Sequence, residues 1–230
     1  MTTAAIGSGR SEALVRWLEA LGALCGAAGG VLFAIGAFAT DVGGKGFNPT
    51  LSPGSVLANL VPFAASYHLA AAALSAASVA LVVGFVALSR RLSANRQGSP
   101  SAQLVLIGGA LLVGLGLLLA ALSVALAVAL ESGNGEAALV IATMEWEFFR
   151  LFLAPAIVVT WATAWASIRD AALPAPFAWI SAAYAALLTV ALIPVFPAGL
   201  VAMTFFFWLI LVSLLMAVLP SARGEPSHTT

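Results

Sequence analysis

Polar residues that can bind a ligand or move a proton are found where the apolar segments of this chain end. A histidine and a tyrosine beside carboxylates can bind a polar molecule, relay a proton or hold a metal ion. Glu147 and Arg150 stand three positions apart and can pair on a helix, whereas Glu145 and Glu147 point in different directions. The predicted ligand-binding cluster comprises Asp41, Tyr67, His68, Glu145, Glu147 and Arg150.

A plainer interpretation of this cluster stays open. The same residues could be the solvated ends of membrane helices, with Trp146, Phe148 and Phe149 as an aromatic belt at the membrane surface. No metal or other cofactor is predicted, because His68 is the only histidine outside the polar C-terminal segment and no His-x₃-His or HExxH spacing is present.

Three aromatic residues with polar atoms fall near the middle of apolar segments, namely Trp161, Tyr184 and Trp208. Such rings prefer the membrane surface, so at depth their N–H and O–H groups need partners. We include them as candidate ligand-binding residues that line an apolar pocket. Pro155 frees the carbonyl of Leu151 in the segment that carries Trp161, and such a break can open a cavity.

Recognised catalytic patterns are absent from the sequence. It contains no G-x-S-x-G, no phosphate-binding loop and no glycine-rich nucleotide fingerprint, so no catalytic residue is predicted. The single cysteine, Cys25, lies in an apolar run and is interpreted as a packing residue. The net charge is zero and no basic block is present, so a nucleic-acid partner is not predicted.

The composition identifies the elements that must position these residues. Apolar residues make up 62% of the 230 positions and charged residues 8%, against about 25% charged residues in soluble domains. Long stretches without charge can each cross the bilayer, which takes about 20 apolar residues. The sequence therefore predicts an all-α fold, a polytopic membrane protein with a six-transmembrane-helix bundle. The spans are expected near 17–39, 67–89, 104–129, 148–168, 177–193 and 199–219.

The distribution of basic residues predicts the orientation. Cytoplasmic loops carry an excess of lysine and arginine. If the N- and C-termini are both inside, seven lysine and arginine residues lie on the cytoplasmic side and two lie on the outer side. The inner set is Arg10, Arg16, Arg90, Arg91, Arg96, Arg169 and Arg223, and the outer set is Lys45 and Arg150. We expect a multi-pass protein of the plasma (inner) membrane with an uncleaved first span, a cytoplasmic segment at 1–16 and a cytoplasmic tail at 220–230.

Two helical segments are longer than a bilayer requires. One begins at Ser52, a predicted N-cap followed by Pro53, and can run to Arg91 with a kink at Pro62. The other runs from Glu136 to Ile168. Both excesses fall on the outer side, so residues 53–66 and the glycine-rich 41–51 segment are expected to cover the outer ends of the bundle.

Small residues at four-residue spacing predict where helices approach closely. Gly22, Gly26 and Gly30 form such a ridge, and shorter pairs are Ala71 with Ser75 and Ala110 with Gly114. The ridge predicts close packing within the monomer, with a homo-oligomer contact as the alternative. Proline and glycine residues between the spans, including Pro194 and Pro197, predict short connections.

Several short patterns resemble a widespread family of uncharacterised bacterial six-span membrane proteins, catalogued as a domain of unknown function. They are Ser52-Pro53 after a span rich in small residues, Ala87-Leu88-Ser89-Arg90-Arg91, Ala166-Ser167-Ile168-Arg169, Leu173-Pro174, Phe177-Ala178-Trp179 and Phe207-Trp208-Leu209. The resemblance implies the six-span topology and supplies no catalytic residues.

These patterns together favour a non-enzymatic protein of the lipid bilayer that binds a small apolar or amphipathic ligand, or a partner, from its outer face. Ion-coupled carriers usually place charged groups at depth, and no carboxylate, lysine or arginine is found in the middle of the spans. A carrier not coupled through buried charges and a membrane enzyme with its site at the outer rim are the alternatives.

Overall fold

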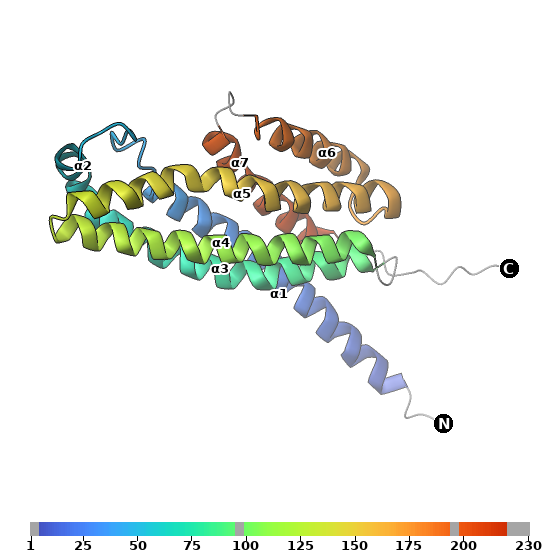
Figure 1. Cartoon of the computed structure of the whole chain (residues 1–230). Helices are drawn as coiled ribbons and strands as arrows, with labels where there is room; N and C mark the ends of the chain where they lie inside the picture. The colour runs from blue at the N-terminus through green and yellow to red at the C-terminus, as the bar shows by residue number, and fades with distance from the viewer. Residues whose placement is uncertain (1–4, 95–98, 194–197, 220–230) are drawn as a thin grey trace.

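The computed structural model of the chain describes residues 5–94, 99–193 and 198–219 (Figure 1). Within these residues helices make up the fold and no strand occurs, so the predicted all-α class is confirmed. The predicted connection at Pro194 and Pro197 and the tail 220–230 lie outside the described residues. The helices are α1 (Ala5–Ala39), α2 (Pro53–Leu60), α3 (Ala64–Ser93), α4 (Pro100–Glu131), α5 (Gly135–Asp170), α6 (Ala175–Val190) and α7 (Ala198–Val218), with the 3₁₀ turn η1 (Val61–Phe63) between α2 and α3.

Four segments of the described chain are long and apolar enough to cross a bilayer, and two shorter apolar helices accompany them. Large apolar side chains such as Leu24, Leu69 and Val79 are exposed on the outward faces. Soluble proteins rarely expose apolar surface on this scale, so the chain suits a membrane-embedded protein. The four segments are Trp17–Ala39, Pro53–Ser93, Pro100–Glu131 and Gly135–Asp170, and the shorter ones are Ala175–Val190 and Met203–Val218.

Neighbouring helices form a bundle in which α3, α4 and α5 run side by side (Figure 1). Helix α1 packs against α3 and α7, α7 also contacts α5, and α6 lies against α5. Each predicted span overlaps one of these helices, although α6 and α7 stop at Val190 and Val218, before the predicted ends at residues 193 and 219. Helix α1 begins at Ala5, within the predicted 1–16 segment, and its first turns project beyond the other helices (Figure 1).

Residues 40–63, here called the cap, cover the end of the bundle where α4 ends and α5 begins (Figure 1). The Ser55 N–H donates to Ser52 Oγ at 3.4 Å and Pro53 starts α2, as predicted. Pro62 lies in η1 and separates α2 from α3, again as predicted. Apolar side chains fix the cap to the bundle, with Val42, Phe47, Val56 and Leu60 packing around Leu126, Leu130, Ala138 and Ala142.

The glycine ridge of α1 packs within the monomer. A Cβ atom on Gly22 would lie 2.2 Å from Ala87 Cβ on α3, and one on Gly26 would lie 2.4 Å from Ser213 Oγ on α7. A Cβ on Gly84 would lie 2.7 Å from Gly26 Cα, so α1 and α3 are in backbone contact at that level. Close packing inside the chain therefore occupies the ridge, and its alternative role in a homo-oligomer stays a prediction.

The other two predicted small-residue pairs do not form packed ridges, although Ala71 itself is buried. Ser75, Ala110 and Gly114 are exposed, and a Cβ on Gly114 would meet nothing within 4 Å. The contact on α4 is instead made by residues such as Gly109, whose Cβ would lie 2.5 Å from Phe85 Cγ. In a helix that is apolar all round, small residues occur on every face, so spacing alone does not identify the packed face.

Aromatic rings fill the centre between α1, α5 and α7. Phe33 stacks on Phe206 with ring centroids 4.3 Å apart, and Phe152 lies 5.2 Å from Phe33 and 5.5 Å from Phe206. Phe33 and Phe206 are fully buried. Because ring pairs at these distances add to the energy of burial, this cluster holds the three helices together at mid-depth.

Candidate functional site

A tight turn after α1 brings a lysine back over the bundle. The Gly44 N–H donates to Asp41 Oδ1 at 3.1 Å, and the Phe47 N–H donates to the Val42 carbonyl at 2.9 Å. Gly46 completes the turn with φ +81°, a conformation that suits glycine. Lys45, the only lysine in the chain, is thereby directed inward and donates to the Ala39 carbonyl.

The Lys45 ammonium group lies over aromatic rings of the cap and α3. Its Nζ is 4.6 Å from the centroid of the Tyr67 ring and 5.9 Å from that of Phe63. These distances fall within the range of cation–π attraction. Burial lowers the pKa of Lys45 below its usual value, and the nearby charges of Asp41 and Glu145 oppose this shift.

Glu145 approaches the lysine from α5 and is 1% exposed. Ser123 Oγ on α4 lies 2.9 Å from Glu145 Oε1 and also 2.9 Å from the Leu119 carbonyl oxygen. The Ser123 hydroxyl carries a single proton, so it can satisfy only one of these acceptors. Glu145 Oε2 has no hydrogen-bond partner in the described structure, which leaves this buried carboxyl group short of donors.

Tyr67 also has a buried oxygen without a hydrogen-bond partner in the described structure. The residue is fully buried, and its hydroxyl has no partner among the described residues. A buried polar atom without a partner costs about 1–3 kcal/mol, and native proteins keep few of them. We call Asp41, Lys45, Phe63, Tyr67 and Glu145 the cage. The cage therefore brings together one ammonium group, one phenol hydroxyl and two carboxyl groups, and two of their oxygens, Tyr67 Oη and Glu145 Oε2, have no partner in the described structure.

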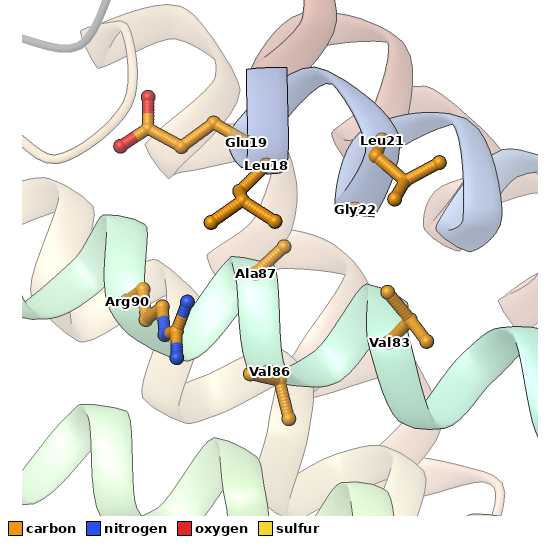
Figure 2. A pocket seen from close by; sticks show the side chains of 8 residues that line it. All are labelled: Leu18, Glu19, Leu21, Gly22, Val83, Val86, Ala87 and Arg90. Atoms are coloured by element: carbon orange, nitrogen blue, oxygen red, sulfur yellow. The ribbon is translucent and has the colours of Figure 1, made fainter. Parts of the chain in front are cut away.

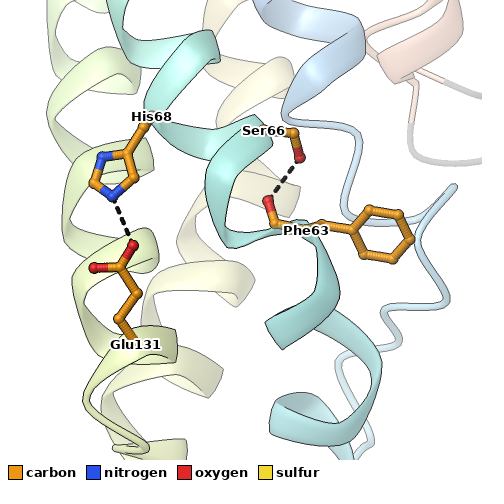
Figure 3. A network of polar contacts seen from close by, with 4 residues as sticks. All are labelled: Phe63, Ser66, His68 and Glu131. Atoms are coloured by element: carbon orange, nitrogen blue, oxygen red, sulfur yellow. Dashed lines mark hydrogen bonds and ion pairs between the residues drawn. The ribbon is translucent and has the colours of Figure 1, made fainter.

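Three residues of the predicted cluster lie outside the cage. His68 Nε2 is 2.9 Å from Glu131 Oε1 at the end of α4, and both side chains are about half exposed (Figure 3). Glu147 Oε2 pairs with Arg150 Nη1 at 3.2 Å on the surface of α5, as their spacing predicted. The expected gathering of His68 with Glu145 and Glu147 does not occur: His68 is paired with Glu131, Glu147 is paired with Arg150, and Glu145 lies in the cage.

Helix geometry explains this division. Successive helical residues point about 100° apart, so Tyr67 can be buried against the bundle while His68 lies on an exposed face of α3. Lys45, Phe63, Ser123 and Glu131 were missed as site residues. The one usable signal was Lys45 itself, a solitary lysine within a glycine-rich segment next to two apolar helices.

The three aromatic residues expected at mid-depth fasten α6 to its neighbours. Trp208 Nε1 donates to Ser181 Oγ at 3.0 Å, and Trp161 Nε1 donates to Thr189 Oγ1 at 3.3 Å. The Tyr184 hydroxyl lies 2.9 Å from Thr204 Oγ1. The predicted need for polar partners is met by α5, α6 and α7 themselves.

A groove of about 310 Å³ lies between α1 and α3, towards the end of α3 opposite the cap. Figure 2 shows apolar side chains such as Leu18, Leu21 and Val83 along it, with Glu19 and Arg90 at one end. The groove shares no residue with the cage. Within the described residues, no three His, Cys, Asp or Glu side chains are grouped as metal ligands would be.

Comparison with protein-family models, curated proteins and solved structures finds no match to this chain. The resemblance to a six-span bacterial family therefore stays a prediction that rests on its short sequence patterns.

Proposed function

We propose that the chain is a six-span integral protein of a bacterial-type plasma membrane, with both termini in the cytoplasm and the cap outside. The excess of lysine and arginine in the predicted inner segments supports this orientation. The length and apolar surface of the helices support the crossings. The resemblance to a six-span family is a further argument for the same topology.

Thiol labelling tests this topology. In a variant that lacks Cys25, cysteines placed at Gly46 and Gly135 should react with an impermeant reagent added to intact cells, and a cysteine at Ser93 should react only after the cells are opened. Reaction at Ser93 in intact cells would refute the orientation.

We propose further that the protein binds a small amphipathic molecule in the cage, from the outer face. The observation that carries this proposal is the pair of buried oxygens without partners, Tyr67 Oη and Glu145 Oε2, beside the ammonium group of Lys45. A ligand with a polar head could satisfy these groups and remove their cost.

The polar groups at mid-depth favour binding over transport. Thr160 and Thr163 each donate to the backbone carbonyl four residues earlier in α5. Such bonds leave the hydroxyls without free donors for a passing solute. A carrier would need a polar path that reaches both faces, and these residues of α5 supply none of its steps.

Matched amphipaths test the binding proposal. We would add decylamine, decanoate or decanol, below their micellar concentrations, to the protein in neutral-lipid nanodiscs and record thermal unfolding. A ligand at ten times its Kd adds about 1.4 kcal/mol, which raises Tm by roughly 3–6 °C in a chain of this size. The rise should shrink in Tyr67→Phe and Glu145→Gln and persist in Glu136→Gln, an exposed carboxylate at the start of α5. The proposal fails if no probe raises Tm, or if all variants respond alike.

A further inference from the structure

The cage contains one ammonium group, which is that of Lys45. Lys45 Nζ lies over the rings of Tyr67 and Phe63 and within electrostatic reach of Asp41 and Glu145. Aromatic faces combined with carboxylates are the chemistry by which proteins recognise organic cations. The lysine is bound by its own chain as a ligand's amine would be.

Lys45 does not satisfy all the polar atoms of the cage. Glu145 Oε2 and Tyr67 Oη are buried and without partners although Lys45 is present. Its side chain is tethered to a turn that contains Gly43, Gly44 and Gly46, so the backbone limits where the ammonium group can lie. A free ligand is not limited by this tether and can approach the two orphaned oxygens directly.

We propose that the ligand of the cage is an organic ammonium ion, and that it binds by displacing the Lys45 ammonium group from between Tyr67, Phe63 and Glu145. This inference rests on the proposed binding function and gives the chemical class of the ligand. A quaternary ammonium head suits the cage especially well, because its methyl groups make it less strongly hydrated than the lysine ammonium group and it loses less when it leaves water.

The surroundings of the cage suit an amphipathic cation. Val61, Phe63 and Trp146 are large apolar residues of the cap end that remain exposed, and the Trp146 ring lies 6.0 Å from that of Phe47. A short alkyl chain that leaves the cage next to Phe63 would meet apolar surface. Lys45 then acts as a tethered occupant that a ligand has to displace.

Removing the tethered amine tests the proposal. The variant Lys45→Met keeps an unbranched side chain that is one atom shorter and vacates the ammonium position. We would measure binding of choline, ethanolamine and 3,3-dimethyl-1-butanol by calorimetry in neutral-lipid nanodiscs. The last compound has the shape of choline without its charge. We expect Lys45→Met to bind choline or ethanolamine at least tenfold more tightly than the wild type, and the neutral alcohol weakly in both proteins.

Two further variants separate the cage from general charge effects. Arg169→Met removes one positive charge from an exposed position at the far end of α5 and should leave choline affinity unchanged. Adding Glu145→Gln to Lys45→Met should reverse the gain. The proposal is overturned if Lys45→Met gains no affinity for either cation, or if the neutral alcohol binds as tightly as choline.

A measurement on the wild-type protein covers the case in which Lys45→Met does not fold. Choline should release Lys45 from the cage and increase its reaction with an impermeant amine reagent, measured by mass spectrometry on the peptide that carries this only lysine. Unchanged or reduced labelling would overturn displacement. If decanol or decanoate stabilises the wild type through the cage while the cations fail, the binding function stands and the ligand class is wrong. If none of the decyl probes acts, the binding function itself has failed.

Discussion

The two tyrosines of the chain allow the orphaned hydroxyl to be tested by the same atomic deletion at two sites. Tyr67→Phe removes a buried hydroxyl that has no partner and keeps the ring under Lys45. An unsatisfied buried polar group costs about 1–3 kcal/mol. We therefore expect the ligand-free protein to gain about 1–2 kcal/mol, which in a chain of this size raises Tm by roughly 2–8 °C.

Tyr184→Phe is the matched control, because the Tyr184 hydroxyl lies 2.9 Å from Thr204 Oγ1. Losing that hydrogen bond should lower stability by about 1 kcal/mol, so the two variants should shift Tm in opposite directions. The assay is thermal unfolding of both variants and the wild type in one neutral detergent, after any bound small molecule has been removed. If Tyr67→Phe is destabilised as much as Tyr184→Phe, the Tyr67 hydroxyl has a partner in the ligand-free state and the orphaned-oxygen argument is wrong.

Two further outcomes follow from packing and charge. Gly26→Leu should lower stability by about 1–3 kcal/mol or more, because its Cβ would lie 2.4 Å from Ser213 Oγ and 3.5 Å from Gly84 Cα; Gly114→Leu, at an exposed site with open space, should cost nothing, and equal Tm losses would mean that the ridge is not packed. The lowered pKa of Lys45 means that the unfolded chain binds more protons than the folded one at alkaline pH below 10.5, so wild-type stability should rise from neutral pH towards 10.5. Lys45→Met should lack this part of the rise in Tm, and parallel profiles for the two proteins would contradict the assignment.

The helices could be predicted because their signals are local. Charge-free runs of spanning length, with prolines and glycines between them, mark the elements, and Ser52 with Pro53 marks the start of α2. Pro62 ends α2 by the same local logic, since it cannot supply a backbone donor. Neither inference required knowledge of which helices are neighbours.

The site could be predicted only in part, because it depends on which face of each helix meets which neighbour. Depth along the chain correctly put Asp41, Tyr67 and Glu145 at one end of the bundle, and it put His68 there as well. The rotation of α3 then separates Tyr67 from His68. Lys45 was counted only as an outer charge, since no periodic pattern in its segment shows that the turn folds inward.

Packing at mid-depth and the position of the cage are connected. Backbone contact at Gly26 and Gly84 and stacked rings at Phe33 and Phe206 close the interior between α1, α3 and α7. Three buried side-chain oxygens lack partners in the described structure: Ser78 Oγ, Tyr67 Oη and Glu145 Oε2. Ser78 lies in the packed interior, where a Cβ on Gly116 would be 2.7 Å from its hydroxyl, so no room is left for a solute there. The other two lie beneath the cap, at the end of the bundle where the proposed ligand would bind.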